Sequence, residues 1–121
     1  MAVDLKVADR MKSRCERMLK RAEPDIPKLA QQGSWDALGG VVKGASRNAL
    51  QLAMIEIRCN KNIDLAKEYF LKVRDLSKVF IDVPAGVVAA SCFEIPIFCC
   101  LLSDDISSAR GLSEVVLSEK V

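Results

Sequence analysis

The side chains that could perform nucleophilic, acid–base or metal chemistry are few in this chain. No histidine occurs among the 121 residues, which removes the usual general base near neutral pH and the commonest metal ligand. Cys99 and Cys100 are adjacent, but neighbouring residues of a helix point in different directions, and no other ligands complete a tetrahedral site. Gly39, Gly40 and Gly44 lack the spacing of a phosphate-binding loop. We therefore expect no catalytic residue, no cofactor and no metal.

Three acidic residues stand at positions that invite a chemical role. Glu94 lies inside an apolar stretch, where burial could shift its pKa, although such a residue more often faces a groove or pairs with a basic side chain of another helix. Asp104 and Asp105 precede a predicted helix, where the helix dipole favours negative charge and an aspartate can cap the first turn. Capping is the favoured interpretation of this pair, and we expect the protein not to be an enzyme.

One surface pattern indicates binding. Basic residues recur at intervals of four, four, three and four near the start of the chain, and residues 1–23 carry seven positive and four negative charges, a net of +3. Such a stripe could attract an acidic protein or a phosphate backbone. Alternatively, it is the ordinary solvent-exposed face of an amphipathic helix. No aromatic residues are interleaved for base stacking, so nucleic acid is the less favoured partner. The candidate partner-binding residues are Lys6, Arg10, Arg14, Arg17, Arg21 and Trp35.

Helices must position these residues, because apolar side chains recur at intervals of three and four and no segment alternates apolar and polar residues. The predicted helical segments are residues 3–22, 26–31, 46–59, 63–80, 85–102 and 106–118. Trp35, Leu38 and Val42 also share a helical face, but the glycines at 39, 40 and 44 make this stretch the weakest helical prediction. The apolar run 85–102 approaches the length of a membrane span, but Glu94 and Pro96 near its centre favour a buried central helix. The expected fold is all-α: one domain over residues 1–121, built from stacked antiparallel helical hairpins in a bundle or short solenoid of about five or six helices.

Composition and cysteine content restrict the class of protein and its cellular compartment. Half of the residues are hydrophobic, 28% are charged and the net charge is +2, which is typical of a globular domain. The five cysteines are an odd number without CxxC spacing, and they resemble small buried hydrophobic residues of a reducing compartment. The first residues do not form a secretory signal. We expect a cytoplasmic protein that is not inserted in a membrane and that could be a fragment of a longer helical stack.

The chain also contains an internal echo with an offset of 43 residues. Ile63 matches Ile106, and Ala66 matches Ala109, so apolar positions keep register between the two segments. This offset is typical of two-helix solenoid units. Two copies do not establish a period, and two amphipathic hairpins of similar length would also align, so both interpretations stay open.

Two short strings carry a family resemblance. Residues 101–112 (LLSDDISSARGL) and residues 62–67 (NIDLAK) resemble the turns between stacked helices in tetratricopeptide-like repeat proteins. Residues 46–118 also repeat the order of an apolar helix, a small polar turn and a helix that opens with an alanine and a basic residue. In this order they are similar to all-helical immunity proteins of bacterial toxin systems. The resemblance implies a protein that neutralises a cognate toxin by binding it.

The leading functional hypothesis is therefore a non-enzymatic protein–protein interaction module, with an immunity or inhibitor protein as its specific form. A nucleic-acid-binding or regulatory helical protein that uses the basic first helix is one alternative. A generic adaptor or scaffold is another. A homodimer is also expected, since so apolar a chain could leave a patch that a symmetric partner covers.

Overall fold

The protein is all-α, as expected. The computed structural model describes residues 5–84 and 86–118, and these contain six α-helices, two short 3₁₀ helices and no strand. The helices are α1 (Leu5–Ala22), α2 (Asp25–Gln32), α3 (Trp35–Arg58), α4 (Ile63–Ser77), η1 (Lys78–Asp82), η2 (Ala90–Cys92), α5 (Glu94–Leu102) and α6 (Ile106–Ser118).

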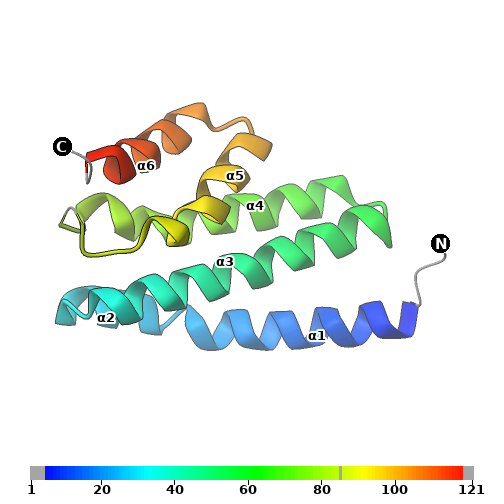
Figure 1. The fold of residues 1–121 in the computed structure, drawn as a ribbon. Coiled ribbons are helices and arrows are strands. Elements are labelled where there is room, and N and C mark those ends of the chain that lie inside the picture. The colour runs from blue at the N-terminus through cyan, green and yellow to red at the C-terminus, as the bar shows by residue number, and fades with distance from the viewer. Residues whose placement is uncertain (1–4, 85, 119–121) are drawn as a thin grey trace.

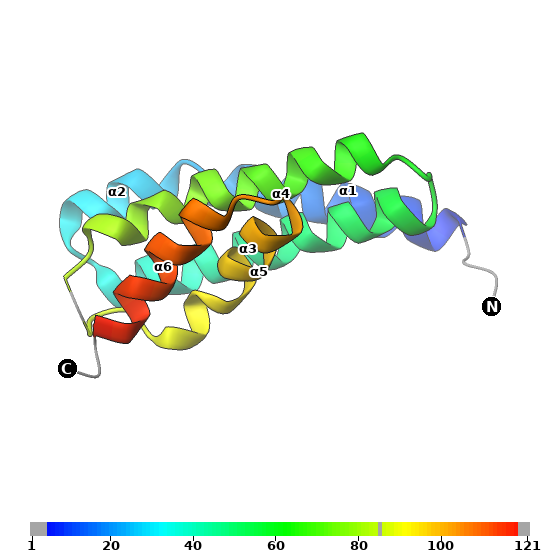
Figure 2. The ribbon, with the colours of Figure 1, turned by 90° about the horizontal axis from the view of Figure 1, so that it is seen from above.

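Helix α3 is the central element. It lies between α1 on one side and α4 on the other, and α5 and α6 lie beyond α4 (Figure 1). Helices α1, α3 and α4 run alternately in opposite directions (Figure 1). When the molecule is seen from above, α6 is nearer to the viewer than α5 (Figure 2). Since α3 contacts α1, α2, α4 and α5, its faces determine how the other helices are placed.

Two clusters of buried apolar side chains hold the helices together. One joins α1, α3, α4 and α5 and includes Leu19, Leu52 and Phe70. The other joins α2, the first half of α3, η1, α5 and α6. In it the rings of Phe80 and Phe93 lie 4.6 Å apart between centroids and are tilted by 35°, a geometry that aromatic pairs favour.

The stretch around Gly39, Gly40 and Gly44 and the segment from Ser46 onward form one helix, because α3 is continuous through its glycines. Gly39 is buried, and a Cβ added there would lie 3.1 Å from Val88 Cγ1 and 3.2 Å from Cys92 Sγ. The glycine thus lets the segment before α5 approach the α3 backbone closely. Packing on both sides of α3 stabilises the helix in spite of the propensity cost.

The long helix predicted over residues 85–102 is also wrong. Only Glu94–Leu102 is α-helical, and the preceding chain contains Gly86 with φ +82° and the single turn η2. Pro96 lies in the first turn of α5, where its missing N–H costs no helical hydrogen bond. Similarly, the segment 63–80 is α-helical as far as Ser77 and continues as η1.

The 43-residue offset reappears in the geometry of two turns. Lys61 and Asp104 have φ of +55° and +60°, the left-handed conformation. The next residue in each turn, Asn62 or Asp105, caps the following helix by accepting the N–H three residues on, at 3.1 and 3.0 Å. The α3–α4 and α5–α6 connections are therefore built alike at equivalent positions.

Candidate functional site

The five basic residues of the stripe lie together on the solvent side of α1. Lys6, Arg10, Arg14, Arg17 and Arg21 are all exposed. Within residues 5–84 and 86–118, the four arginines form no ion pair with any acidic side chain. Their positive charges are therefore available to another molecule.

The acidic residues of α1, and Glu23 just after its end, lie on the other flank. Asp9, Glu16 and Glu23 are spaced by seven and share one helical face. A carboxylate oxygen of Glu23 lies 2.7 Å from Lys72 Nζ of α4, which places this acidic face toward α4. The arginines and the acidic residues therefore occupy different flanks of this part of the chain, and of the acidic residues Glu23 contacts α4.

Between the arginines and the core, α1 exposes an apolar edge. The sequence pattern places Val7, Met11, Cys15, Met18 and Leu19 in one apolar stripe. Cys15 and Leu19 are buried, but Val7, Met11 and Met18 remain 41%, 44% and 45% exposed. The stripe is wider than the surface that α3 covers, so half of it faces solvent.

This edge forms one wall of an apolar groove, which we call the seam groove, between α1 and the second half of α3. Its volume is about 420 Å³, within the range of about 300–1,000 Å³ that is usual for ligand-binding pockets. The residues that line it are Val7, Ala8, Met11, Leu50, Gln51, Met54, Ile55, Arg58 and Cys59. No aromatic side chain is among them.

A second hollow lies further along the same two helices. Met18 and Arg21 of α1 and Gly40 and Gly44 of α3 line it, and its volume is about 270 Å³. A Cβ at Gly40 or Gly44 would meet no atom within 4 Å, so these glycines leave the α3 backbone uncovered. The face between α1 and α3 is therefore hollowed at both of its ends.

The α3 side of this face is basic as well. Arg58 lines the seam groove, and Arg47 is exposed eleven residues earlier, about three helical turns away on the same face. Neither arginine forms an ion pair in the described part of the chain. Basic side chains thus flank the groove from both helices, while Asp25 belongs to the lining of the second hollow.

An ion pair with a buried carboxylate links the two walls. Glu56 of α3 is only 2% exposed, and its Oε1 lies 2.8 Å from Lys12 Nζ of α1. Asn60 Nδ2 donates to the other carboxylate oxygen at 3.0 Å. Lys12 holds the pKa of Glu56 below its ordinary value, against the opposing effect of burial. A second link runs from the Cys15 thiol to Gln51 Oε1 at 3.2 Å.

The sequence analysis missed Glu56 and named only Glu94 as an acid whose burial could shift its pKa. Glu94 is exposed at the start of α5, and no buried site surrounds it. A sequence signal for Glu56 did exist: it occupies a position in register with the apolar residues Leu52 and Ala49 of α3. A charged residue in a buried register requires a partner, but the sequence does not show that the partner is Lys12.

Trp35 does not join the basic stripe. It is half-buried at the start of α3 and packs against the cluster that contains Ile26 and Phe80. It also lines a shallow hollow with Gly33 and Gly86. The structure therefore brings the five basic residues together and places the tryptophan in a separate environment.

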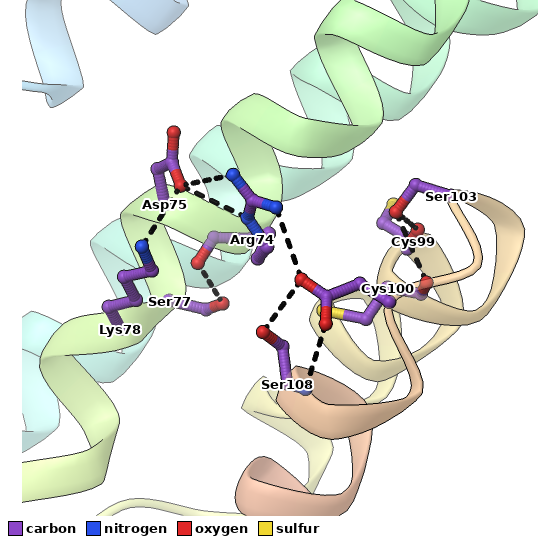
Figure 3. A network of polar contacts seen from close by, with 9 residues as sticks. Arg74, Asp75, Ser77, Lys78, Cys99, Cys100, Ser103 and Ser108 are labelled. Atoms are coloured by element: carbon purple, nitrogen blue, oxygen red, sulfur yellow. Dashed lines mark hydrogen bonds and ion pairs between the residues drawn. The ribbon is translucent and has the colours of Figure 1, made fainter.

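The polar network between α4 and α6 has a structural explanation (Figure 3). Asp105 Oδ1 accepts the Ser108 N–H at 3.0 Å, and Oδ2 accepts the Ser108 hydroxyl at 2.8 Å and Arg74 Nη1 at 3.1 Å. The bonds from Ser108, followed by Arg74, lower the pKa of Asp105. The aspartate caps α6, as expected, and a carboxylate held ionised in this way is a poor general acid.

The cysteines differ in accessibility. Cys15, Cys92, Cys99 and Cys100 are buried, and Cys59 is partly exposed. Burial raises the pKa of Cys99 to about 12 and also raises the pKa of Cys15 and Cys100. Cys59, at the end of the seam groove, is therefore the accessible thiol of the five.

Comparison of the chain with protein-family models, curated proteins and solved structures gives no match. None of the helices in the described ranges is both long and apolar enough to cross a membrane. In the same residues, no three cysteine or acidic side chains are grouped so that they could hold a metal ion.

Proposed function

We propose that the protein acts by binding another protein through the face formed by α1 and α3. The observation that carries this proposal is the seam groove, an apolar depression with Met11 and Met54 in its lining. Desolvated apolar pockets with a polar rim are the usual centre of protein interfaces. The arginines of α1 supply such a rim and would guide the encounter with an oppositely charged partner.

In the specific form of this function, the bound protein is a toxin that the chain neutralises. The support for this form is the resemblance of residues 46–118 to all-helical immunity proteins of bacterial toxin systems. We place the binding event in the cytoplasm, because all five cysteines are free and free buried thiols are typical of reducing compartments.

An alternative function has one observation in its favour. The four arginines Arg10, Arg14, Arg17 and Arg21 are exposed and unpaired within the described residues, as phosphate-contacting residues must be. An apolar groove beside them is not needed for backbone contacts, and it has no aromatic side chain for base stacking. Protein binding explains both the charges and the groove.

The test is a pull-down from the native host with two matched variants as bait. Met11→Gln places a polar group of similar length in the groove, and Ile106→Gln changes an apolar residue of similar exposure on α6 (44% and 53% exposed). We expect the wild type and Ile106→Gln to retain a stoichiometric protein that Met11→Gln loses. Equal recovery by both variants, or recovery of nucleic acid alone, would contradict the proposal.

A further inference from the structure

The seam groove and the second hollow together describe a surface that fits a helix. From Gly40 to Arg58, α3 rises by about 27 Å at 1.5 Å per residue, and hollows lie beside α1 toward both ends of this length. A helix laid along two neighbouring helices places side chains at intervals of three and four into such hollows. A segment of about 18 residues would span the face.

An extended peptide fits this face less well. Both walls are α-helices whose backbone groups are already hydrogen-bonded within the helix, so an added strand would find no free ladder of donors and acceptors. The recognition has to come from side chains. Three of the four methionines of the chain, Met11, Met18 and Met54, line the two hollows, and methionine adapts its shape to apolar side chains of different form.

The charges of the face define the other property of the occupant. Arg58 lines the groove on α3, and Arg47 is exposed on the same helical face. On α1, Arg10 and Arg14 are exposed next to Met11, which lines the groove. In the described residues no acidic side chain lies within ion-pair distance of any of the four. An occupant with carboxylates along both flanks of its apolar stripe would pair with both rows of arginines.

We propose that the occupant is an amphipathic, acidic α-helix of a partner protein, with apolar residues at helical intervals and Asp or Glu on both sides of them. This inference rests on the proposed function and specifies the partner for the same groove. The apolar floor is matched by the apolar stripe of the helix, and the two basic rims by its acidic flanks.

Cys59 provides a direct readout, because it lines the groove and is the accessible thiol of the chain. The probe is a synthetic helix of about 18 residues with leucines at intervals of three and four and glutamates beside them. One control peptide carries lysine in place of every glutamate, and another keeps the composition but breaks the helical period. The rate of Cys59 alkylation in the full-length protein is measured with each peptide.

We expect the acidic helix to slow alkylation of Cys59 and the two control peptides to leave the rate unchanged. Met11→Gln should weaken the protection, while Ile106→Gln should not. Arg10→Gln combined with Arg14→Gln should weaken it about three- to tenfold, since two exposed ion pairs are lost. Removal of two charges elsewhere, by Lys67→Gln with Arg110→Gln, is the matched control and should have little effect.

Several outcomes would overturn the inference. These are equal protection by the lysine peptide, equal protection by the peptide without helical period, or no protection by any peptide. Stronger protection by duplex DNA or by anionic lipid vesicles than by the acidic helix would also overturn it. If the host partner depends on Met11 but binds through a segment that is not an acidic helix, this inference fails while the proposed function stands.

Discussion

The ion pair between Lys12 and Glu56 offers the sharpest test of how α1 is attached to α3. Lys12→Met removes the cation and leaves a carboxylate that is 2% exposed, with Asn60 as its remaining side-chain donor. Loss of one partner from a fully buried pair costs about 3–5 kcal/mol. Because the Lys12 side chain is itself 30% exposed and Asn60 still donates, we expect a loss of about 2–3 kcal/mol at neutral pH.

The contribution of Glu56 to the free energy of unfolding depends on pH with opposite signs in the wild type and in Lys12→Met. In the wild type, Lys12 lowers the pKa of Glu56 from its ordinary value of 4.5. The stability that the ionised pair contributes is therefore present above pH 4.5 and is lost as the pH falls through the lower folded value. In Lys12→Met, burial is the dominant remaining influence and raises the pKa of Glu56. The penalty is then largest at neutral pH and shrinks as the pH falls toward 4.5.

The measurement is urea unfolding followed by circular dichroism, at neutral and mildly acidic pH, for the wild type, Lys12→Met, Glu56→Met and the double variant. We expect the double variant to be within about 1 kcal/mol of the wild type, because two apolar side chains replace the pair without leaving a buried charge. Two results would refute the reasoning: a Lys12→Met protein as stable as the wild type, or a Lys12→Met penalty that does not change with pH.

Three further predictions concern other parts of the fold. Gly40→Ala should raise the free energy of unfolding by about 0.5–1 kcal/mol, because its Cβ enters open space in a helix. Gly39→Ala should lower the free energy of unfolding by about 1–2 kcal/mol, because its Cβ would press on buried Val88. Urea unfolding of the two alanine variants compares them directly, and equal effects would contradict the close approach. The buried Ser46 hydroxyl has no hydrogen-bond partner in the described residues, so Ser46→Ala should raise the urea midpoint, with a gain of about 1 kcal/mol. Asp105→Ala should lower the thermal midpoint at neutral pH. This loss should fade as the pH falls from 3.8, the ordinary pKa, through the lower pKa of the folded carboxylate. A midpoint difference independent of pH would show that the cap acts without its charge.

The sequence predicted the fold class because helical periodicity is a local property. It could not predict the secondary structure of residues 85–102, since a uniformly apolar run lacks the polar positions that would reveal a helical or strand period. The backbone reversal at Gly86 and the late start of α5 at Glu94 depend on packing against α3. The same packing makes Gly39 suitable inside a helix, where propensity alone argues against it.

The candidate site was predictable in part, for a related reason. The basic stripe belongs to one helix, so its spacing could be read directly from residues 6–21. The seam groove needs a second wall from Leu50 and Met54, which lie at least 39 residues after Val7 and Met11 of the first wall. The pairing of Glu56 with Lys12 likewise joins residues 44 positions apart, and no local pattern reveals it.

The charge arrangement of α1 is costly for the free protein. Lys6 and Arg10, Arg10 and Arg14, and Arg17 and Arg21 are like charges four residues apart, and each such pair destabilises a helix by about 0.2–0.5 kcal/mol. A helix shaped only for stability and solubility would mix acids among these bases, yet Asp9 and Glu16 lie on the other flank of α1. Substituting Arg10 and Arg14 by glutamine should therefore relieve repulsion in the free protein while weakening the hold on an acidic helix. Such opposed effects on stability and binding are expected of a surface whose charges serve a partner rather than the fold.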